Sequence, residues 1–395
     1  MDKKLQSLIV LLFCAMIVSF LIGEAIVRSI GHFDRDGNFF VYSFHTYPYR
    51  MPLHSWNEMI NKYLKSKNIR FIYDPSLGWI PRPKIKSKSG LYSYNSDAIR
   101  TDTIESVISK IPRQGVLRIA IFGDSFTHSD DVSFKETWGD LLEKNLKKAG
   151  VDAEVLNFGV PGYGMDQSLL RWEKTGYMYD PQIVIFGLQL ENINRNVNLA
   201  RPLCYPNSGI PLFKPRFILE QNVLKLINTP TPLPDKIIDI VSQFDTWEYS
   251  KYEGWYEKDK YQDHIFLNSK LISLCYSLIN EKCFKKEVEY KEGSEVLSLA
   301  IIQKFKEEVE SRGKTFYVVF LPKKPELKSK NIGFLEKMDK SIVIINPLSS
   351  FLKEAGKSSV KALILVHYSA KGNKIVADAL TDFILKEKRC PQISP

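Results

Sequence analysis

The sequence predicts an α/β domain built on a parallel β-sheet and preceded by one transmembrane helix. From residue 116 onward, short apolar runs rich in β-forming residues alternate with amphipathic helical segments, a rhythm typical of βαβ units. Near the amino end, twenty largely apolar residues, 8–27, have the length of a bilayer-spanning helix. Residues that carry chemistry follow the predicted strands, which is where open parallel sheets hold their active sites.

The composition indicates a chain that folds along most of its length. It has 395 residues, and 44% of them are hydrophobic, an ordinary value for a globular protein. The net charge of +10 favours anionic surroundings such as a membrane surface or an acidic polymer. No basic run is interleaved with aromatic residues, so we expect no nucleic-acid partner. No Cys/His spacing resembles a zinc site, and we expect neither a metal nor a cofactor.

Residues 1–30 are predicted to anchor the chain in the cell inner membrane as a single-pass helix. Lys3 and Lys4 favour a cytoplasmic amino terminus, which places the rest of the chain in the periplasm or outside the cell. A cleaved signal peptide is the alternative. The apolar run is long for such a peptide, no small-x-small site follows it clearly, and Cys14 lacks the small residue before it that a lipoprotein site needs. We therefore favour an uncleaved anchor; Glu24 is either tolerated at the membrane boundary or meets a partner helix there.

Four cysteines follow the predicted anchor: Cys204, Cys275, Cys283 and Cys390. An exported domain permits disulfides, and four cysteines allow three pairings. Cys275 and Cys283 are close enough in sequence to close a small loop. We expect all four to be structural bystanders.

Beyond the anchor, the sequence predicts three regions. Residues 31–115 are predicted to form a linker and lead-in that pack on the main domain. The first half is interpreted as a linker because it is rich in aromatic residues but shows no clean periodicity. The main domain comprises 116–197 and 294–390. Residues 198–293 contain no repeating βα units and form an insertion or cap. The predicted strands are 116–122, 154–160, 182–188, 315–321 and 341–345, with a short edge strand within 91–102. The predicted helices are 138–148, 166–178, 265–279, 295–312 and 374–386.

Three residues that follow predicted strands, together with a histidine that follows the segment 361–366, fit acyl transfer by serine. This chemistry needs a nucleophilic hydroxyl, an imidazole to accept its proton, and donors that hold the developing oxyanion. Ser125 supplies the hydroxyl and a backbone N–H, Gly162 a second N–H, Asn192 a side-chain amide, and His367 the imidazole. Each has an ordinary structural alternative, such as a turn for the glycine or a helix cap for the asparagine. All four residues occur in one sequence, one after another along the predicted domain, which favours the catalytic interpretation.

The motifs around these residues resemble those of the SGNH (GDSL-like) hydrolases, in particular membrane-anchored bacterial members. The matching blocks are GDSFT, NFGVPGYG, LENINRN and HYSAKGN, and the lead-in segments YDPSLGW and YNSDAIRTD are similar to those of the anchored members. The resemblance covers about 73–383, except 198–293. It implies a flavodoxin-like three-layer α/β/α sandwich, Ser125 as nucleophile and His367 as base. It also implies an oxyanion hole formed by Ser125, Gly162 and Asn192.

The fourth block departs from the family pattern at the acidic member of the triad. The family usually has an aspartate two or three residues before its histidine, and Leu365 and Ile364 occupy those positions here. That carboxylate would fix the imidazole tautomer and stabilise the imidazolium. A backbone carbonyl could replace it in a Ser–His dyad, or a carboxylate could come from Asp130, Asp131 or the insertion.

Two further charged or polar residues bear on the site. Glu191 precedes Asn192 where a glycine is usual, and its carboxylate would weaken the oxyanion hole through its field. His128 follows the nucleophile closely, and we expect it near the pocket mouth, where it contacts the substrate or nothing and is not the base.

The sequence thus predicts a membrane-anchored, extracytoplasmic serine esterase. It would remove O-acyl groups from a cell-envelope glycan or related substrate, and acetyl is the acyl group we expect. One alternative is an O-acyltransferase that receives an acyl group from a donor or membrane partner and passes it to a sugar hydroxyl. Another is a catalytically weak binding protein in envelope assembly. Five insertion aromatics either stack on sugar rings or, as we expect for most, form the core of a small subdomain: Tyr249, Tyr252, Trp255, Tyr256 and Tyr261.

Overall fold

The computed structural model describes residues 3–282, 290–329 and 332–389. The chain divides into two compact units. The N-terminal unit comprises Met1–Lys65, Asp235–Lys251 and Trp255–Glu289, and the sheet unit comprises Ser66–Pro234, Tyr252–Gly254 and Tyr290–Pro395. The regions expected at 31–115 and 198–293 therefore each contribute to both units.

The sheet unit contains an eight-stranded sheet whose central part is parallel. Its five parallel strands are β9 (Leu117–Phe122), β10 (Ala153–Asn157), β11 (Ile183–Leu188), β14 (Thr315–Phe320) and β15 (Val343–Ile345). Their order is β15-β14-β11-β9-β10, which is the flavodoxin-like order with β9 as first strand. Three short antiparallel strands extend the sheet beyond β10: β8 (Arg100–Thr101), β7 (Ser93–Tyr94) and β6 (Ile85–Lys86). The predicted α/β class with a parallel sheet is confirmed.

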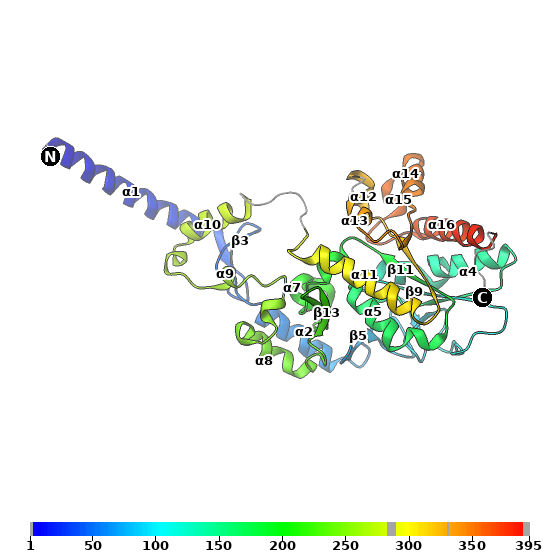
Figure 1. Cartoon of the computed structure of the whole chain (residues 1–395). Coiled ribbons are helices and arrows are strands. Elements are labelled where there is room, and N and C mark those ends of the chain that lie inside the picture. The colour runs from blue at the N-terminus through cyan, green and yellow to red at the C-terminus, as the bar shows by residue number, and fades with distance from the viewer. Residues whose placement is uncertain (1–2, 283–289, 330–331, 390–395) are drawn as a thin grey trace. The chain divides into compact units, whose positions relative to one another are not determined.

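Helices cover both faces of this sheet, as the alternation of side chains along a buried strand requires (Figure 1). At the end of β9, Phe122 packs against Trp172 of α5 (Met165–Lys174) and Phe305 of α11 (Ser294–Glu310). The preceding Ile121 points to the opposite face, where its Cδ1 lies against Gly139 of α4 (Trp138–Lys148). Helix α16 (Ala370–Arg389) packs beside α4 on that face. The result is a three-layer sandwich.

The remaining elements of the sheet unit are short. They are β4 (Phe71–Asp74), β5 (Gly78–Pro81), α3 (Ser125–His128), α6 (Asn192–Arg195), α7 (Arg201–Cys204), β12 (Arg216–Glu220), β13 (Val223–Ile227), α12 (Lys324–Ser329), α13 (Gly333–Glu336), α14 (Leu348–Lys357) and α15 (Val360–Leu363). Strands β4 and β5 pair with each other, as do β12 and β13.

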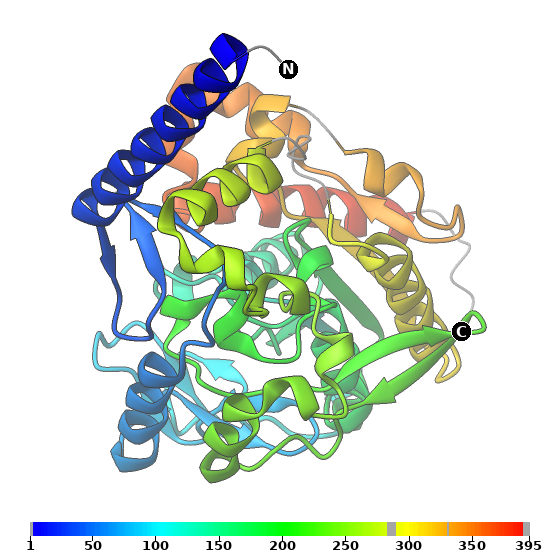
Figure 2. The same cartoon turned by 90° about the vertical axis from the view of Figure 1, so that its left-hand side faces the viewer.

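The N-terminal unit begins with α1 (Lys3–Ile30), which is long and apolar enough to cross a membrane. It continues into a three-stranded sheet of β1 (Gly31–Phe33), β2 (Phe39–Val41) and β3 (Phe44–His45) (Figure 2). The helices α2 (Leu53–Lys65), α8 (Ile237–Ser242), α9 (Lys258–Tyr261) and α10 (Lys270–Lys282) complete it.

The segment expected to be a linker without periodicity contains these three strands and α2. Helix α2 buries Trp56 and Ile60, one turn apart, and packs against α8. That apolar face is only one turn long, and the helix it packs against lies almost 180 residues further along the chain. The local sequence periodicity was therefore too weak to predict α2.

Glu24 caps another helix of the same chain. Its carboxylate accepts hydrogen bonds from Ser269 Oγ (2.7 Å), Lys270 N (3.0 Å) and Leu271 N (2.8 Å) at the start of α10. These backbone N–H groups have no partner within α10, so the carboxylate satisfies them. Arg28, one turn further along α1, donates to the same carboxylate at 2.6 Å. The end of α1 is thus part of the N-terminal unit's own fold.

Among the described residues, Cys14, Cys204 and Cys275 form no disulfide. Cys283 and Cys390 lie outside the described residues. The possible loop between Cys275 and Cys283 stays a prediction.

Candidate active site

Ser125 stands where β9 ends and the chain turns into α3. Gly123 has φ +154°, and a Cβ there would lie 2.2 Å from Thr127 Oγ1 and 2.9 Å from the Gly187 carbonyl oxygen, so only glycine fits this turn. Asp124 then caps α3 by accepting a hydrogen bond from Phe126 N at 2.9 Å. The strand order reverses between β9 and β11, so Ser125 lies at the switch point where open sheets bind ligands.

His367 lies directly beside Ser125, although 242 residues separate them along the chain. A tight turn after α15 presents the imidazole: Ile364 bridges to Tyr368, and Leu365 N donates to the His367 carbonyl at 2.9 Å. The imidazole Nε2 is 2.9 Å from Ser125 Oγ. The structure therefore brings together the two residues that the sequence predicts as base and nucleophile.

Asp131 supplies the carboxylate that the fourth block lacks. Its Oδ2 is 2.8 Å from His367 Nδ1, on the opposite side of the ring from the serine. A proton on Nδ1 donates to this carboxylate, which leaves Nε2 free to accept the serine proton. Of the positions where the family has its acid, Ile364 is buried and Leu365 points to solvent with 62% exposure. Asp131 was one of three sources left open, and the sequence had no means of choosing it.

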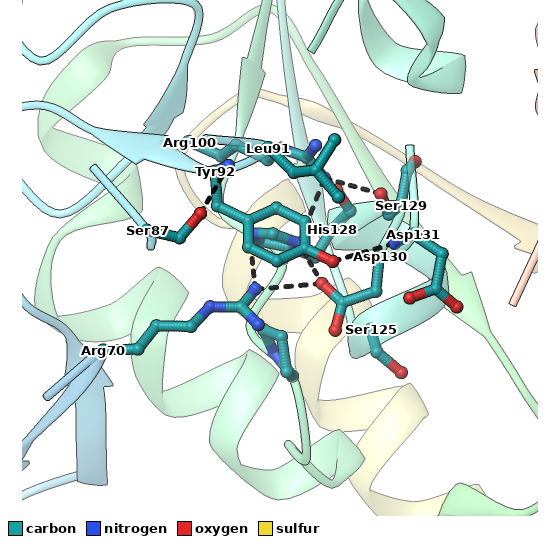
Figure 3. A network of polar contacts seen from close by, with 12 residues as sticks. Arg70, Ser87, Leu91, Tyr92, Arg100, Ser125, His128, Ser129, Asp130 and Asp131 are labelled. Carbon is teal, nitrogen blue, oxygen red and sulfur yellow. Dashed lines mark hydrogen bonds and ion pairs between the residues drawn. The ribbon is translucent and has the colours of Figure 1, made fainter. Parts of the chain in front are cut away.

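The turn that carries Asp131 is held by the lead-in segment (Figure 3). Ser129 and Asp131 both adopt left-handed backbone conformations, with φ of 59° and 72°. Tyr92 Oη accepts a hydrogen bond from Asp131 N at 2.9 Å. Arg100 donates to the carbonyls of His128, Ser129 and Val132, the last two at 2.7 Å. These contacts fix an unusual backbone that would otherwise be costly.

Asp130 points the other way, into a buried ionic cluster (Figure 3). Its carboxylate lies 2.9 Å from Arg70 Nη2 and 2.6 Å from His128 Nδ1. Burial alone would raise the pKa of Asp130, but His128 and Arg70 hold it well below its usual range. The two adjacent aspartates therefore have different roles: Asp130 is part of the buried ionic cluster, and Asp131 faces His367.

The expected position of His128 at the pocket mouth is wrong. Its side chain is fully buried, not at the mouth of a pocket, and Nε2 lies 2.9 Å from Tyr94 Oη. Burial and the nearby Arg100 hold the pKa of His128 well below its usual range, despite the attraction of Asp130. A neutral ring donates from Nδ1 to Asp130 and accepts at Nε2 from Tyr94. His128 is a structural residue of the turn.

Three donors near the nucleophile have no partner among the described residues. They are the backbone N–H groups of Ser125 and Gly162 and the side-chain amide of Asn192. Gly162 has φ +85°, a conformation that favours glycine. Asn192 is buried, and its Oδ1 lacks a hydrogen bond. Unpaired donors of this kind can stabilise an oxyanion, as the sequence predicts for these three residues.

Arg195 connects the loops that carry these donors. It belongs to α6, the helix that Asn192 begins. Its Nη1 lies 3.1 Å from Asp124 Oδ2, beside the nucleophile, and 3.3 Å from the Tyr163 carbonyl oxygen, beside the loop glycine. Its Nη2 donates to Glu191 at 2.8 Å. One buried guanidinium thus positions all three predicted sources of the oxyanion hole.

The carboxylate of Glu191 is balanced by neighbouring groups. It pairs with Arg195 and Lys323, and Tyr205 Oη donates to it. Burial alone would raise the pKa of Glu191, but these two cations hold it well below its usual range. The expected weakening of the oxyanion hole by this charge is therefore offset within the site.

The first lead-in motif braces the loop of Gly162. Trp79, which is fully buried, donates from Nε1 to the Pro161 carbonyl at 3.2 Å. In return, Tyr163 Oη donates to the Trp79 carbonyl at 2.7 Å. These supports were missed because the motif carries no catalytic side chain; its tryptophan and glycine were the available signal.

Most of the insertion aromatics pack on one another. In the N-terminal unit, Tyr256 packs edge-on against Phe244 and at a tilt against Tyr261, with ring centroids 4.9 and 4.6 Å apart, and Trp247 packs against Tyr249. This arrangement supports the subdomain-core interpretation. Within the described ranges, no group of three His, Cys, Asp or Glu side chains is placed to hold a metal ion.

Comparison with known proteins adds structural similarity at low sequence identity. No protein-family model and no curated protein matches the chain. Among solved structures, the acetyl xylan esterase AlAXEase is 14% identical, with 68% of this chain and 99% of that chain covered and a TM-score of 0.36. Esterase EstA from a Pseudoalteromonas species is 11% identical, covering 69% and 100%, with a TM-score of 0.33. A lipolytic protein of the G-D-S-L family from Veillonella parvula is 10% identical, covering 68% and 98%, with a TM-score of 0.33.

Proposed function

We propose that this protein is a serine esterase that removes O-acyl groups through Ser125, His367 and Asp131. The observation that carries the proposal is the continuous relay from Asp131 Oδ2 through the imidazole to Ser125 Oγ, with both contacts below 3 Å. His367 accepts the serine proton as Ser125 attacks the ester carbonyl, and Asp131 stabilises the imidazolium. The imidazolium then protonates the departing alcohol, and water releases the acyl group by the reverse steps.

The oxyanion that forms during attack would be held by the Ser125 and Gly162 N–H groups and the Asn192 amide. All three are unpaired within the described part of the chain, so no existing hydrogen bond has to break when the charge develops. Such pre-positioned donors are a large source of rate acceleration in acyl transfer. Arg195 fixes their loops in advance.

The substrate we propose is an acylated glycan of the cell envelope, with acetyl as the acyl group. The grounds are the motif resemblance and the apolar helix α1, which would hold the active site at a membrane surface. Lys3 and Lys4 favour a cytoplasmic amino terminus and an extracytoplasmic active site. Glu24 and Arg28 bind the start of α10, and this favours an uncleaved anchor because cleavage beyond them would remove part of the fold.

The binding-protein alternative rested on the missing acid, and Asp131 weakens that ground. The transferase alternative shares the acyl-enzyme and differs in whether water or a sugar hydroxyl accepts the acyl group. We favour hydrolysis as the simpler outcome, and the product test below separates the two.

The first test labels the nucleophile in the full chain, purified in detergent micelles. A fluorophosphonate probe should add to the peptide containing Ser125, and a Ser125→Ala variant with unchanged circular dichroism should carry no adduct. Mass spectrometry reads the result. An unlabelled but folded wild-type protein would refute the proposed nucleophile.

The second test follows the acetyl group from p-nitrophenyl acetate, with and without an added oligosaccharide. For an esterase, free acetate accounts for all released p-nitrophenol in both cases. Acetylated oligosaccharide in place of acetate would identify a transferase instead.

The proposed location is tested by protease treatment of spheroplasts. An extracytoplasmic domain is digested in intact spheroplasts, whereas a cytoplasmic marker protein is not. Protection of the domain until the membrane is lysed would contradict the proposed orientation.

A further inference from the structure

Arg201 is a buried cation whose guanidinium has no hydrogen-bond or ion-pair partner among the described residues. Arg201 is only 5% exposed, and its guanidinium donates no hydrogen bond to any described group. Its Nε is buried and has no hydrogen-bond acceptor. Burial, together with the nearby positive charge of Arg195, lowers the pKa of Arg201 to about 10. The side chain therefore stays charged at neutral pH, although an unpaired buried charge is costly.

This situation is exceptional within the molecule. The described part of the chain buries six arginines, and the other five all donate hydrogen bonds to carboxylates or carbonyls: Arg100, Arg118, Arg171, Arg195 and Arg216. The carboxylate of Glu191, which acts on Arg201 electrostatically, is already paired with Arg195 and Lys323. Among the described residues, Arg201 is thus the one buried arginine whose guanidinium donates no hydrogen bond.

The unused guanidinium lies beside the predicted oxyanion hole. Its Nη2 is 3.3 Å from the position that a Cβ on Gly162 would occupy. Its Cζ lies 4.1 Å above the ring of Tyr205, and the guanidinium of Arg195 lies 5.1 Å from the same ring. Since Arg195 also contacts Asp124, the residue before the nucleophile, Arg201 belongs to the same side-chain assembly as the site.

Hydrogen bonds hold the backbone that leads into Arg201. Glu253 accepts hydrogen bonds from Leu199 N at 2.6 Å and Ala200 N at 2.8 Å. Arg201 N donates to the Leu212 carbonyl at 3.2 Å. The side chain is therefore presented from a rigid position and is not one conformer of a loose loop.

We propose that Arg201 binds an anionic group of the substrate, a carboxylate or a phosphate, next to the acyl ester. The inference rests on the proposed esterase function and narrows its substrate to an acidic glycan, such as one containing uronic acids or phosphorylated sugars. A planar guanidinium suits such groups because it donates two parallel hydrogen bonds to them. The substrate would supply the partner that the chain itself does not.

The first experiment measures ligand-induced stabilisation and does not depend on turnover. Sodium glucuronate or inorganic phosphate, added to the full chain in micelles at constant ionic strength, should raise Tm by about 2–4 °C relative to glucose with sodium chloride. The glucuronate arm reports a carboxylate site and the phosphate arm a phosphate site. Arg201→Gln should abolish the increase and raise the Tm of the unliganded protein, because it removes an unpaired buried charge.

The second experiment compares a charged and a neutral ester of the same shape, 4-acetoxybenzoate and 4-acetoxybenzamide, with 4-acetoxyphenyl phosphate as the phosphate analogue. The ratio of kcat/KM for charged over neutral ester should fall about 10- to 100-fold in Arg201→Gln, with Arg201→Lys intermediate. Arg113→Gln is the control for charge. Arg113 is 79% exposed and precedes β9, so it lies at the opposite end of the strand from Ser125.

The outcomes separate this inference from the proposed function. If wild-type protein hydrolyses none of the esters, the esterase proposal fails. If it hydrolyses them and Arg201→Gln slows charged and neutral esters equally, or anions stabilise wild type and variant alike, the anion site is refuted and the esterase stands.

Discussion

Asp131 is the residue on which the catalytic proposal can be tested most sharply. Replacing it with asparagine presents an amide to His367 Nδ1, which favours the wrong imidazole tautomer and leaves the imidazolium without its counter-charge. Asp131→Asn should lower kcat for p-nitrophenyl acetate by about 100- to 10,000-fold. Because its side chain is half exposed, Tm should change little.

The neighbouring Asp130 provides a matched control. Its carboxylate is buried between Arg70 and His128, so Asp130→Asn should cost about 3 kcal/mol of unfolding free energy. Loss of activity should then follow loss of fold. Equal kcat in Asp131→Asn and wild type would remove Asp131 from the mechanism.

Asn192 allows the oxyanion hole to be tested apart from stability. Its side chain forms no hydrogen bond with any described residue, so Asn192→Ala should change the free energy of unfolding by less than about 1 kcal/mol. It should nevertheless lower kcat by about 100- to 1,000-fold, the usual effect of losing one oxyanion donor.

The comparison variant lies one turn further along the chain, at Asn196, the residue that caps the C-terminal end of α6. Asn196 accepts from Met165 N at 2.9 Å and donates to Ser298 Oγ at 2.7 Å, so Asn196→Ala should chiefly reduce stability. A variant of Asn192 that is unstable but fully active at low temperature would contradict the assigned role.

At the scale of elements, the parallel sheet was predictable because its strands are short, largely apolar runs, and candidate site residues follow three of them, β9, β10 and β11. The approach of Asp131 to His367 was not, since it depends on left-handed conformations at Ser129 and Asp131 that distant contacts with Tyr92 and Arg100 help to stabilise. Both lead-in motifs turned out to be supports for site loops. Their partners lie far along the chain, so spacing alone gave no indication of them.

A substitution of Arg195 tests how strongly the loops that carry the site residues depend on one buried cation. Arg195 is the shared partner of Asp124 and Glu191, and its removal would leave the buried Asp124 carboxylate without this cation and Glu191 with Lys323 alone. Arg195→Met should cost about 3–5 kcal/mol of unfolding free energy, measured by thermal and denaturant unfolding. Arg201→Gln, which removes the same charge from an unpaired position, should have the opposite sign. A stabilised Arg195→Met would show that the loops hold together without it.

At the scale of the whole molecule, the sequence could not define the two units because the N-terminal one is assembled from separated segments. Local patterning identified α1 and most of α10, but nothing local joins Glu24 to residues 269–271. The contact requires a carboxylate at one end of a long apolar helix and free N–H groups at the start of another. Neither the carboxylate nor the free N–H groups can be recognised in the sequence as partners until the contact between α1 and α10 is known.

The pairing of α1 with α10 predicts that the anchor also stabilises the fold next to it. Glu24→Ala removes the acceptor for the first amides of α10, at a cost of about 1 kcal/mol, so Lys270 and Leu271 should exchange hydrogen about fivefold faster. Glu58→Ala, at an exposed ion pair of the same unit, is the control and should leave that exchange unchanged. Intact mass of the chain extracted from membranes should include α1, since removal through Arg28 would delete the cap. A mature chain that starts beyond Arg28 and still protects these amides would refute both the cap and the uncleaved anchor.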